Sequence, residues 1–105
     1  MSCTDRFAAA NFEAQEGARA RVTGPLHFST VTALLGVGRE AIEGGCADLI
    51  DLSGVTESDS SGLALLVEWL AVAKQAKRNL RYDNIPKQIQ ELAHLSDVEE
   101  LLIPR

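Results

Sequence analysis

The segment spanning residues 49–66 constrains the fold of this chain more than any other. It begins with the short apolar run 49–52, continues through a stretch rich in hydroxyl and carboxylate side chains, and enters an apolar stretch at Gly62. A short apolar run is typical of a strand that is buried on both faces. The order therefore predicts a strand of a parallel sheet, then a polar loop, then a helix.

Three polar residues, Asp59, Ser60 and Ser61, are predicted to lie at the N-terminus of that helix. The first backbone N–H groups of a helix have no partner within it, and the macrodipole places about half a positive charge there. Such a position suits a carboxylate or a phosphorylated serine. Two interpretations stay open: Asp59 or Ser60 is a simple N-cap, or a hydroxyl is presented to a partner protein.

Hydrophobic periodicity, caps and glycine or proline stops divide the rest of the chain into further elements. The alternation of Ala18, Ala20 and Val22 with polar residues predicts a strand that pairs with the one before it as a hairpin. The predicted elements are strands over 11–15 and 18–23, a helix from a Ser29 or Thr30 cap to Gly44, a strand over 46–52, a helix over about 60–77, a strand over 79–83, a helix from Pro86, and a last apolar piece over 98–103 that is either a strand or a turn.

This order predicts the α/β class, with a mixed sheet of about four strands that opens with a β-hairpin and is covered by about three to four helices. Residues 1–11 are expected to form a flexible tail, and residues 12–105 a single domain. The polar segment after Leu52 then lies beyond the carboxyl end of a strand, where function tends to gather in open α/β sheets.

The helix over residues 60–77 carries apolar residues on two sides. At 100° per residue, one side holds Leu63, Leu66, Val67 and Leu70, and the nearly opposite side holds Leu65, Trp69, Val72 and Ala76. One side must cover the sheet, although the sequence does not tell which. The other side packs on a neighbouring helix, such as the third, or forms a partner surface. We predict a partner surface that includes Leu65, Trp69 and Val72, because a domain this small has few elements to spare and because tryptophan is enriched among interface anchors.

Composition narrows the classes of function. The chain has 105 residues, 46% of them apolar and 24% charged, with a net charge of −5, and these values are ordinary for one globular domain. It has no basic cluster, so nucleic acid is not expected as a partner. The longest apolar stretch, residues 63–73, contains Glu68 and is shorter than the about 20 residues of a membrane span.

The N-terminal residues do not follow the pattern of a secretory signal, since Asp5 and Arg6 interrupt the apolar residues there. We therefore expect a cytoplasmic location. Cys3 and Cys46 belong to no CxxC pattern and are expected to be reduced thiols. His27 and His94 share no metal-ligand spacing, so neither a metal nor another cofactor is expected.

A serine hydrolase is a third interpretation of Ser60, and the sequence offers little for it. A nucleophilic serine needs a base within hydrogen-bond reach and an oxyanion hole, and the chain has no G-x-S-x-G pattern. The carboxylates of Asp51, Glu57 and Asp59 belong to a small domain without a predicted cleft, which does not favour glycoside chemistry. We expect a protein that is not an enzyme and has no catalytic residues.

The segments DLSGV (51–55) and DSSGLALL (59–66) resemble the signature of STAS domains, a family named for sulfate transporters and anti-sigma factor antagonists. The resemblance extends from about residue 12 to the end of the chain and includes the order of the elements. It implies a small α/β domain that acts by binding other proteins.

Two branches of this family are similar to the chain. In the anti-sigma factor antagonists, a kinase phosphorylates the serine after the aspartate, which by similarity is Ser60. In the small STAS subunits of Mla-type phospholipid ABC transporters, the same position lies in the region that contacts the cytoplasmic ATPase. Residues 62–66, 73–75 and 101–105 resemble the second branch. That branch typically has threonine followed by glycine where this chain has Ser60 and Ser61, which leaves phosphorylation open.

The resemblance thus implies a cytoplasmic accessory subunit, peripheral to the inner membrane through its partner, in a complex that maintains outer-membrane lipid asymmetry. The expected partner is the ABC transporter ATPase, and the alternative is an anti-sigma factor antagonist with Ser60 as the phosphorylated residue. The residues expected to bind the partner are Asp59, Ser60, Ser61, Leu65, Trp69 and Val72.

Overall fold

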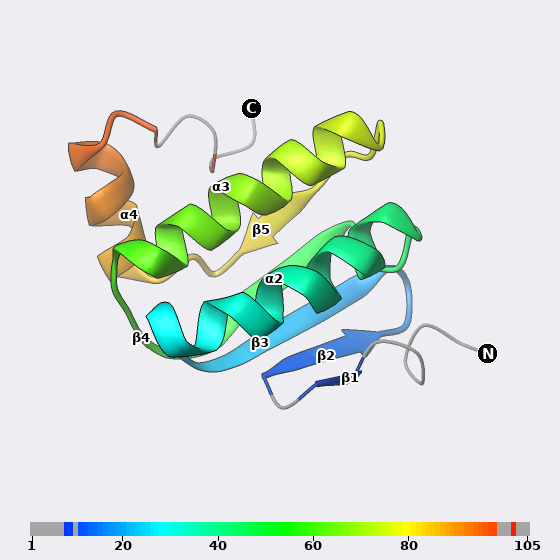
Figure 1. Ribbon diagram of the computed structural model, residues 1–105, viewed down its shortest axis with the longest axis horizontal. Helices are drawn as coiled ribbons and strands as arrows, with labels where there is room; N and C mark the ends of the chain where they lie inside the picture. The colour runs from blue at the N-terminus through cyan, green and yellow to red at the C-terminus, as the bar shows by residue number, and fades with distance from the viewer. Residues whose placement is uncertain (1–7, 10, 99–101, 103–105) are drawn as a thin grey trace.

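In the computed structural model, which describes residues 8–9, 11–98 and 102, five strands form one mixed sheet in the order β1-β2-β3-β4-β5 (Figure 1). The elements are β1 (Ala8–Ala9), β2 (Phe12–Gln15), β3 (Arg19–Leu26), α2 (Phe28–Glu43), β4 (Leu49–Ser58), α3 (Ser60–Gln75), β5 (Arg81–Asp83) and α4 (Lys87–Leu95). The predicted α/β class and mixed sheet are confirmed.

The sheet opens with the predicted hairpin. Strands β2 and β3 pair antiparallel, with Phe12 opposite Val22 and Gln15 opposite Arg19. The short strand β1 pairs antiparallel with β2 and adds a strand that the sequence did not predict. It falls within residues 1–11, where a tail was expected, and residues 1–7 and 10 of that segment lie outside the described residues.

Strand β4 is longer than predicted. It starts at Leu49 rather than Cys46 and continues through the polar residues to Ser58, pairing parallel with β3 up to Leu26 opposite Ser58. The prediction of a loop directly after Leu52 is therefore wrong. Two register shifts between β3 and β4 take up the irregular part of the pairing, so backbone pairing overrides the polar character of the side chains.

Both long helices, α2 and α3, lie on the same face of the sheet (Figure 1). The side chains that point toward them from the strands are buried: Phe12, Ala14, Ala20, Val22, Ile50, Leu52 and Tyr82. Their sequence neighbours Glu13, Arg19 and Arg21 are exposed. The alternation thus gives the sheet one buried face and one face that stays open to solvent.

Helix α2 begins earlier than predicted, with His27 as its N-cap rather than Ser29 or Thr30. The hydroxyl of Thr30 accepts a hydrogen bond from the backbone N–H of His27 at 3.0 Å, and it donates to the carbonyl of Pro25 at 2.9 Å. Thr30 therefore stabilises the start of the helix from within its first turn.

Trp69 of α3 is fully buried between α3, α2 and the sheet. Its indole N–H donates to the carbonyl of Leu35 in α2 at 3.3 Å, and its ring meets the ring of Phe12 edge to face with centroids 6.0 Å apart. On the other flank, the buried Tyr82 hydroxyl of β5 donates to the carbonyl of Leu66 at 2.7 Å. Burial raises the pKa of the Tyr82 phenol well above its usual range.

Other expectations meet the structure only in part. Cys46 is disulfide-bonded, so the expectation of a reduced thiol is wrong for this residue, and Cys3 lies outside the described residues.

Of the apolar piece 98–103, only Val98 and Leu102 are described, and Leu102 is buried. Within the described part of the chain, no helix combines the length and the apolar character of a membrane span.

Candidate functional site

The site predicted at residues 59–61 is built by two parallel strands that end side by side. Leu26 at the end of β3 is in register with Ser58 at the end of β4, and the N–H of Asp59 donates to the carbonyl of Leu26 at 3.1 Å. Helices α2 and α3 follow these strands within two residues, so their N-termini lie at the same end of the sheet (Figure 1).

The predicted helix cap is present, and it is Asp59. Its carboxylate accepts a hydrogen bond from the N–H of Ser61 at 2.8 Å. Gly62 allows the close approach of this turn to the strands, because a Cβ there would overlap with the Ser58 hydroxyl and meet Leu26. Ser60 is exposed, and its hydroxyl makes no hydrogen bond with the described part of the chain. The cap thus leaves the Ser60 hydroxyl available to a partner.

An apolar groove runs between α2 and α3 from this corner. It is lined by Phe28, Val31, Thr32, Leu35, Ser61, Ala64, Leu65 and Glu68. The side chain of Phe28, at the start of α2, is 80% exposed, whereas only 4% of Leu65 is exposed at the floor. We call Asp59, Ser60, Ser61 and this groove the corner surface. A large exposed aromatic ring beside a groove is typical of a protein interaction site.

The charges at the corner surface are negative. Glu57, Asp59 and Glu68 are exposed around it. A second hollow, lined by Leu26, His27, Glu57, Ser58, Asp59 and Gln88, lies beside the first. Neither hollow is lined by a lysine or an arginine among the described residues. The surface thus combines an apolar groove with a negative rim, and a complementary partner presents apolar and basic side chains.

In the described part of the chain, no base is hydrogen-bonded to the Ser60 hydroxyl, the serine considered as a nucleophile. The nearest histidine of this corner, His27, has its Nδ1 within 2.7 Å of the Ser29 hydroxyl rather than of Ser60.

Helix α4 closes the other side of the corner, where the Gln88 side chain accepts a hydrogen bond from the N–H of Ser58 at 3.0 Å. Among the residues that the structure describes, no His, Cys, Asp or Glu side chains are grouped so as to hold a metal ion.

Three of the predicted partner-binding residues, Leu65, Trp69 and Val72, are buried. Trp69 is 0% exposed and Val72 is 4% exposed, because the side of α3 that carries them packs within the domain, with Trp69 against α2. The prediction that they form an exposed surface is wrong, and the alternative of packing on a neighbouring helix holds. That helix is α2 rather than the third helix that we named. Leu65 keeps a place at the site only as part of the groove floor.

Asp51 lies away from the corner, on the open face of the sheet. Its carboxylate accepts hydrogen bonds from the Asn84 amide at 3.0 Å, the Ser53 N–H at 2.9 Å and the Ser53 hydroxyl at 3.0 Å. The Asn84 hydrogen bond, the Ser53 hydrogen bonds and the nearby charge of Arg21 hold the pKa of Asp51 below its usual value, against a small opposing effect of burial. The Asn84 bond ties β4 to the segment after β5, whereas the Ser53 bonds lie within β4.

Phe28 is the exposed aromatic residue of the corner surface, and the sequence interpretation did not assign it to the site. It lies three residues before Val31, which belongs to the apolar face of α2, so periodicity alone would assign it to the core. Its proximity to Ser61 arises from the parallel pairing of β3 and β4, which brings the starts of two helices together. No sequence pattern marks that proximity.

Comparison with known proteins agrees with this architecture. Residues 11–104 match the family described as "Mlab, STAS domain". The chain is 30% identical over 91 residues to the intermembrane phospholipid transport system binding protein MlaB of Escherichia coli (strain K12), a match that covers 87% of this chain and 92% of that protein. The MlaB protein of Shigella flexneri matches with the same identity and coverage.

Two solved structures share the fold. The anti-sigma factor antagonist SpoIIAA in its unphosphorylated form matches 88% of this chain and 85% of its own, with a TM-score of 0.67 and 16% identity. The Bacillus cell fate determinant SpoIIAA in the phosphorylated form matches 88% of both chains, with a TM-score of 0.64 and 16% identity. The family match over nearly the whole chain, together with the MlaB relatives, shows that this chain belongs to the STAS domain family and is close to MlaB.

Proposed function

We propose that this chain is a non-enzymatic accessory subunit that binds the cytoplasmic ATPase of a phospholipid-transport ABC complex. The similarity to MlaB, whose name assigns it to an intermembrane phospholipid transport system, supports the class of system. In this proposal the chain is cytoplasmic and is held at the inner membrane by the ATPase. There it affects the assembly or the activity of a complex that maintains outer-membrane lipid asymmetry.

The observation that carries the proposal is the exposed ring of Phe28 beside the groove and the Ser60 hydroxyl. Phe28 is 80% exposed and lines the apolar groove, whereas Leu95, which is exposed to a similar degree, does not line it. Transfer of a phenylalanine side chain from water into an interface contributes about 1.5–3 kcal/mol. The groove between α2 and α3 continues this apolar contact along both helices, and the helix N-terminus at Ser60 adds polar groups at its end.

The corner surface also indicates what the ATPase presents. The rim formed by Glu57, Asp59 and Glu68 favours a segment with basic side chains flanking apolar ones. Within such an interface a carboxylate in place of Ser60 lies beside Asp59 and is desolvated. We therefore expect Ser60→Asp to weaken binding more than Ser60→Ala.

Photo-crosslinking with the purified ATPase tests the proposal. A benzophenone amino acid is placed at Phe28, at Ser60 or, as the control, at Leu95 of α4, which is 81% exposed and lies outside the groove. We expect crosslinks to the ATPase from positions 28 and 60 and none from 95. No crosslink from any position, or equal crosslinking from all three, would overturn the proposal.

The anti-sigma factor antagonist is the second candidate function, and the exposed Ser60 hydroxyl at the start of α3 is the observation that favours it. Incubation with a serine kinase of the anti-sigma type and ATP would then add one phosphate to the chain and none to Ser60→Ala. A stable complex with that kinase, together with no binding of the ABC ATPase, would favour this function over the first.

A further inference from the structure

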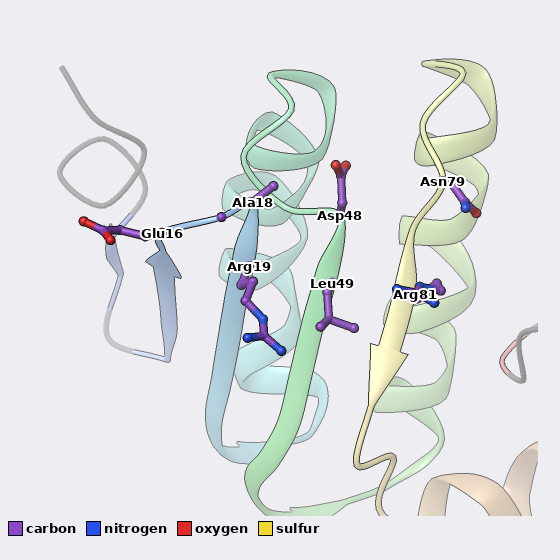
Figure 2. Close-up of a pocket in the computed structure, with 8 residues that line it drawn as sticks. Glu16, Ala18, Arg19, Asp48, Leu49, Asn79 and Arg81 are labelled. Atoms are coloured by element: carbon purple, nitrogen blue, oxygen red, sulfur yellow. The ribbon is translucent and has the colours of Figure 1, made fainter.

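The open face of the sheet carries a feature that the corner surface does not explain. Strands β3, β4 and β5 run parallel, and parallel strands are usually covered on both faces. Here the helices cover one face, and a hollow on the other lies where these three strands begin (Figure 2). The residues that line it are Glu16, Gly17, Ala18, Arg19, Asp48, Leu49, Asn79 and Arg81.

Two arginines flank this hollow from strands on either side of β4. Arg19 of β3 and Arg81 of β5 are both in register with Leu49 of β4. The three side chains project from the same end of the sheet (Figure 2). Neighbouring strands are about 4.8 Å apart, so the two arginine backbones are about 10 Å apart, a gap that two long side chains can close from both sides.

The guanidinium groups of Arg19 and Arg81 are uncommitted. Both residues are exposed, and neither guanidinium makes a hydrogen bond or ion pair with the described part of the chain. The lining also holds two carboxylates, Glu16 and Asp48. Asp48 pairs with Arg78, a residue outside the lining, at 3.4 Å, so that Glu16 is the lining carboxylate without a paired cation among the described residues. The local charge at the hollow is therefore positive, although the chain as a whole is acidic.

The next row of in-register residues on the same three strands contains both arginine and aspartate. Two residues further on, Arg21 is in register with Asp51, and Asp51 with Asp83. There the Asp51 carboxylate lies beside Arg21 and balances part of the arginine charge. In the first row Leu49 stands at that position instead, half-buried and without charge. The row Arg19–Leu49–Arg81 thus has two cations and no acid between them.

We propose that Arg19 and Arg81 bind one phosphate group across Leu49. Planar guanidinium groups donate two parallel hydrogen bonds to a phosphate, and two such groups on opposite sides can neutralise a dianion. The exposed amide of Asn79 offers a further donor at the rim. Glu16 disfavours a long polyanion, so the ligand is a compact phosphate, either a free phosphate ester or the head group of an acidic phospholipid.

The test follows backbone amide NMR shifts of the whole chain during titration with inorganic phosphate at constant ionic strength. We expect saturable shifts at residues 18–19, 49 and 81, and an affinity about tenfold or more weaker in Arg19→Gln and Arg81→Gln. Leu49→Asp, which copies the second row, should abolish binding. Arg39→Gln is the matched control, because Arg39 is exposed on α2, away from the hollow.

Sedimentation with vesicles distinguishes the two sources of phosphate. Binding to vesicles of phosphatidylglycerol and phosphatidylcholine, but not of phosphatidylcholine alone, and its loss in Arg81→Gln, assigns the site to a lipid head group. Phosphate shifts without vesicle binding assign it to a free phosphate ester. The proposal is overturned if chloride alone produces the same shifts, or if Arg19→Gln and Arg81→Gln bind phosphate as the Arg39→Gln control does, with the variants folded as judged by thermal unfolding.

Discussion

The indole ring of Trp69 lies directly against the Cα of Gly38, where any Cβ would overlap with it. This contact lets α3 approach α2 closely enough for the indole N–H to reach the carbonyl of Leu35. It therefore determines how the two helices pack, and with them the width of the groove that ends at Phe28 and Ser61.

Gly38→Ala should destabilise the domain by about 1–3 kcal/mol, because the added methyl group forces the buried indole to move. Gly36→Ala is the matched control in the same helix. A Cβ at Gly36 meets open space, so alanine should stabilise the helix by up to about 1 kcal/mol. Urea unfolding of both variants measures the difference. Equal effects of the two substitutions would contradict the contact.

Trp69→Ala should cost about 3–5 kcal/mol of unfolding free energy, since it empties a fully buried site. Glu68→Ala, at the exposed neighbouring position of α3, should stay within about 0.5 kcal/mol of the wild type. Fluorescence quenching by acrylamide gives an independent check, because the single tryptophan should be protected in the free protein. Ready quenching of the Trp69 fluorescence would mean that the side chain is exposed and would contradict its burial.

The cap of α3 can be separated from the hydroxyl of Ser60. Asp59→Ala should lower the free energy of unfolding by about 1 kcal/mol, because the N–H of Ser61 loses its acceptor. Ser60→Ala should leave stability nearly unchanged, since that hydroxyl makes no hydrogen bond with the described part of the chain. Thermal and urea unfolding of the two variants measure this. The reverse order would mean that Ser60 is the structural residue.

The Asp51 cluster should make stability depend on pH in acid. The pKa of Asp51 is lower in the folded chain than its unfolded value near 4, so its contribution is fully present above about pH 4 and is lost as pH falls through the folded pKa. The difference in unfolding free energy between the wild type and Asp51→Asn should therefore shrink as pH falls below about 4. A constant difference down to about pH 2 would contradict this. Asp83→Asn, a carboxylate in the same row that makes no hydrogen bond with the described residues, is the control.

Local signals in the sequence were sufficient for the order of the elements from β2 to α4 and for the position of the α3 N-terminus. The alternation in residues 18–23 predicted the hairpin, and the order of polar and apolar residues placed Asp59 at the start of α3, where the structure has it. Such signals act within one or two turns of chain, so the structure changes the boundaries of these elements and adds the short strand β1. The extension of β4 to Ser58 is an example, because pairing with β3 decides it.

The parts that the sequence could not predict depend on which elements become neighbours. Helical periodicity shows that two sides of α3 are apolar, and it contains no information about which neighbour covers Trp69. In the same way, Phe28 and Ser61 are 33 positions apart and meet only because β3 and β4 run parallel in this register. Tertiary pairing rather than local propensity thus creates the corner surface.

The most direct test of the proposed function is the affinity of the purified chain for the ATPase, measured by isothermal titration calorimetry for the wild type, Phe28→Asp and Leu95→Asp. Phe28 and Leu95 are exposed to nearly the same degree, 80% and 81%, so both variants should fold like the wild type. We expect Phe28→Asp to weaken binding by about tenfold or more, and Leu95→Asp to bind within about twofold of the wild type. Undiminished binding by Phe28→Asp, or no binding by the wild type, would contradict the assignment of the corner surface as the ATPase-binding site.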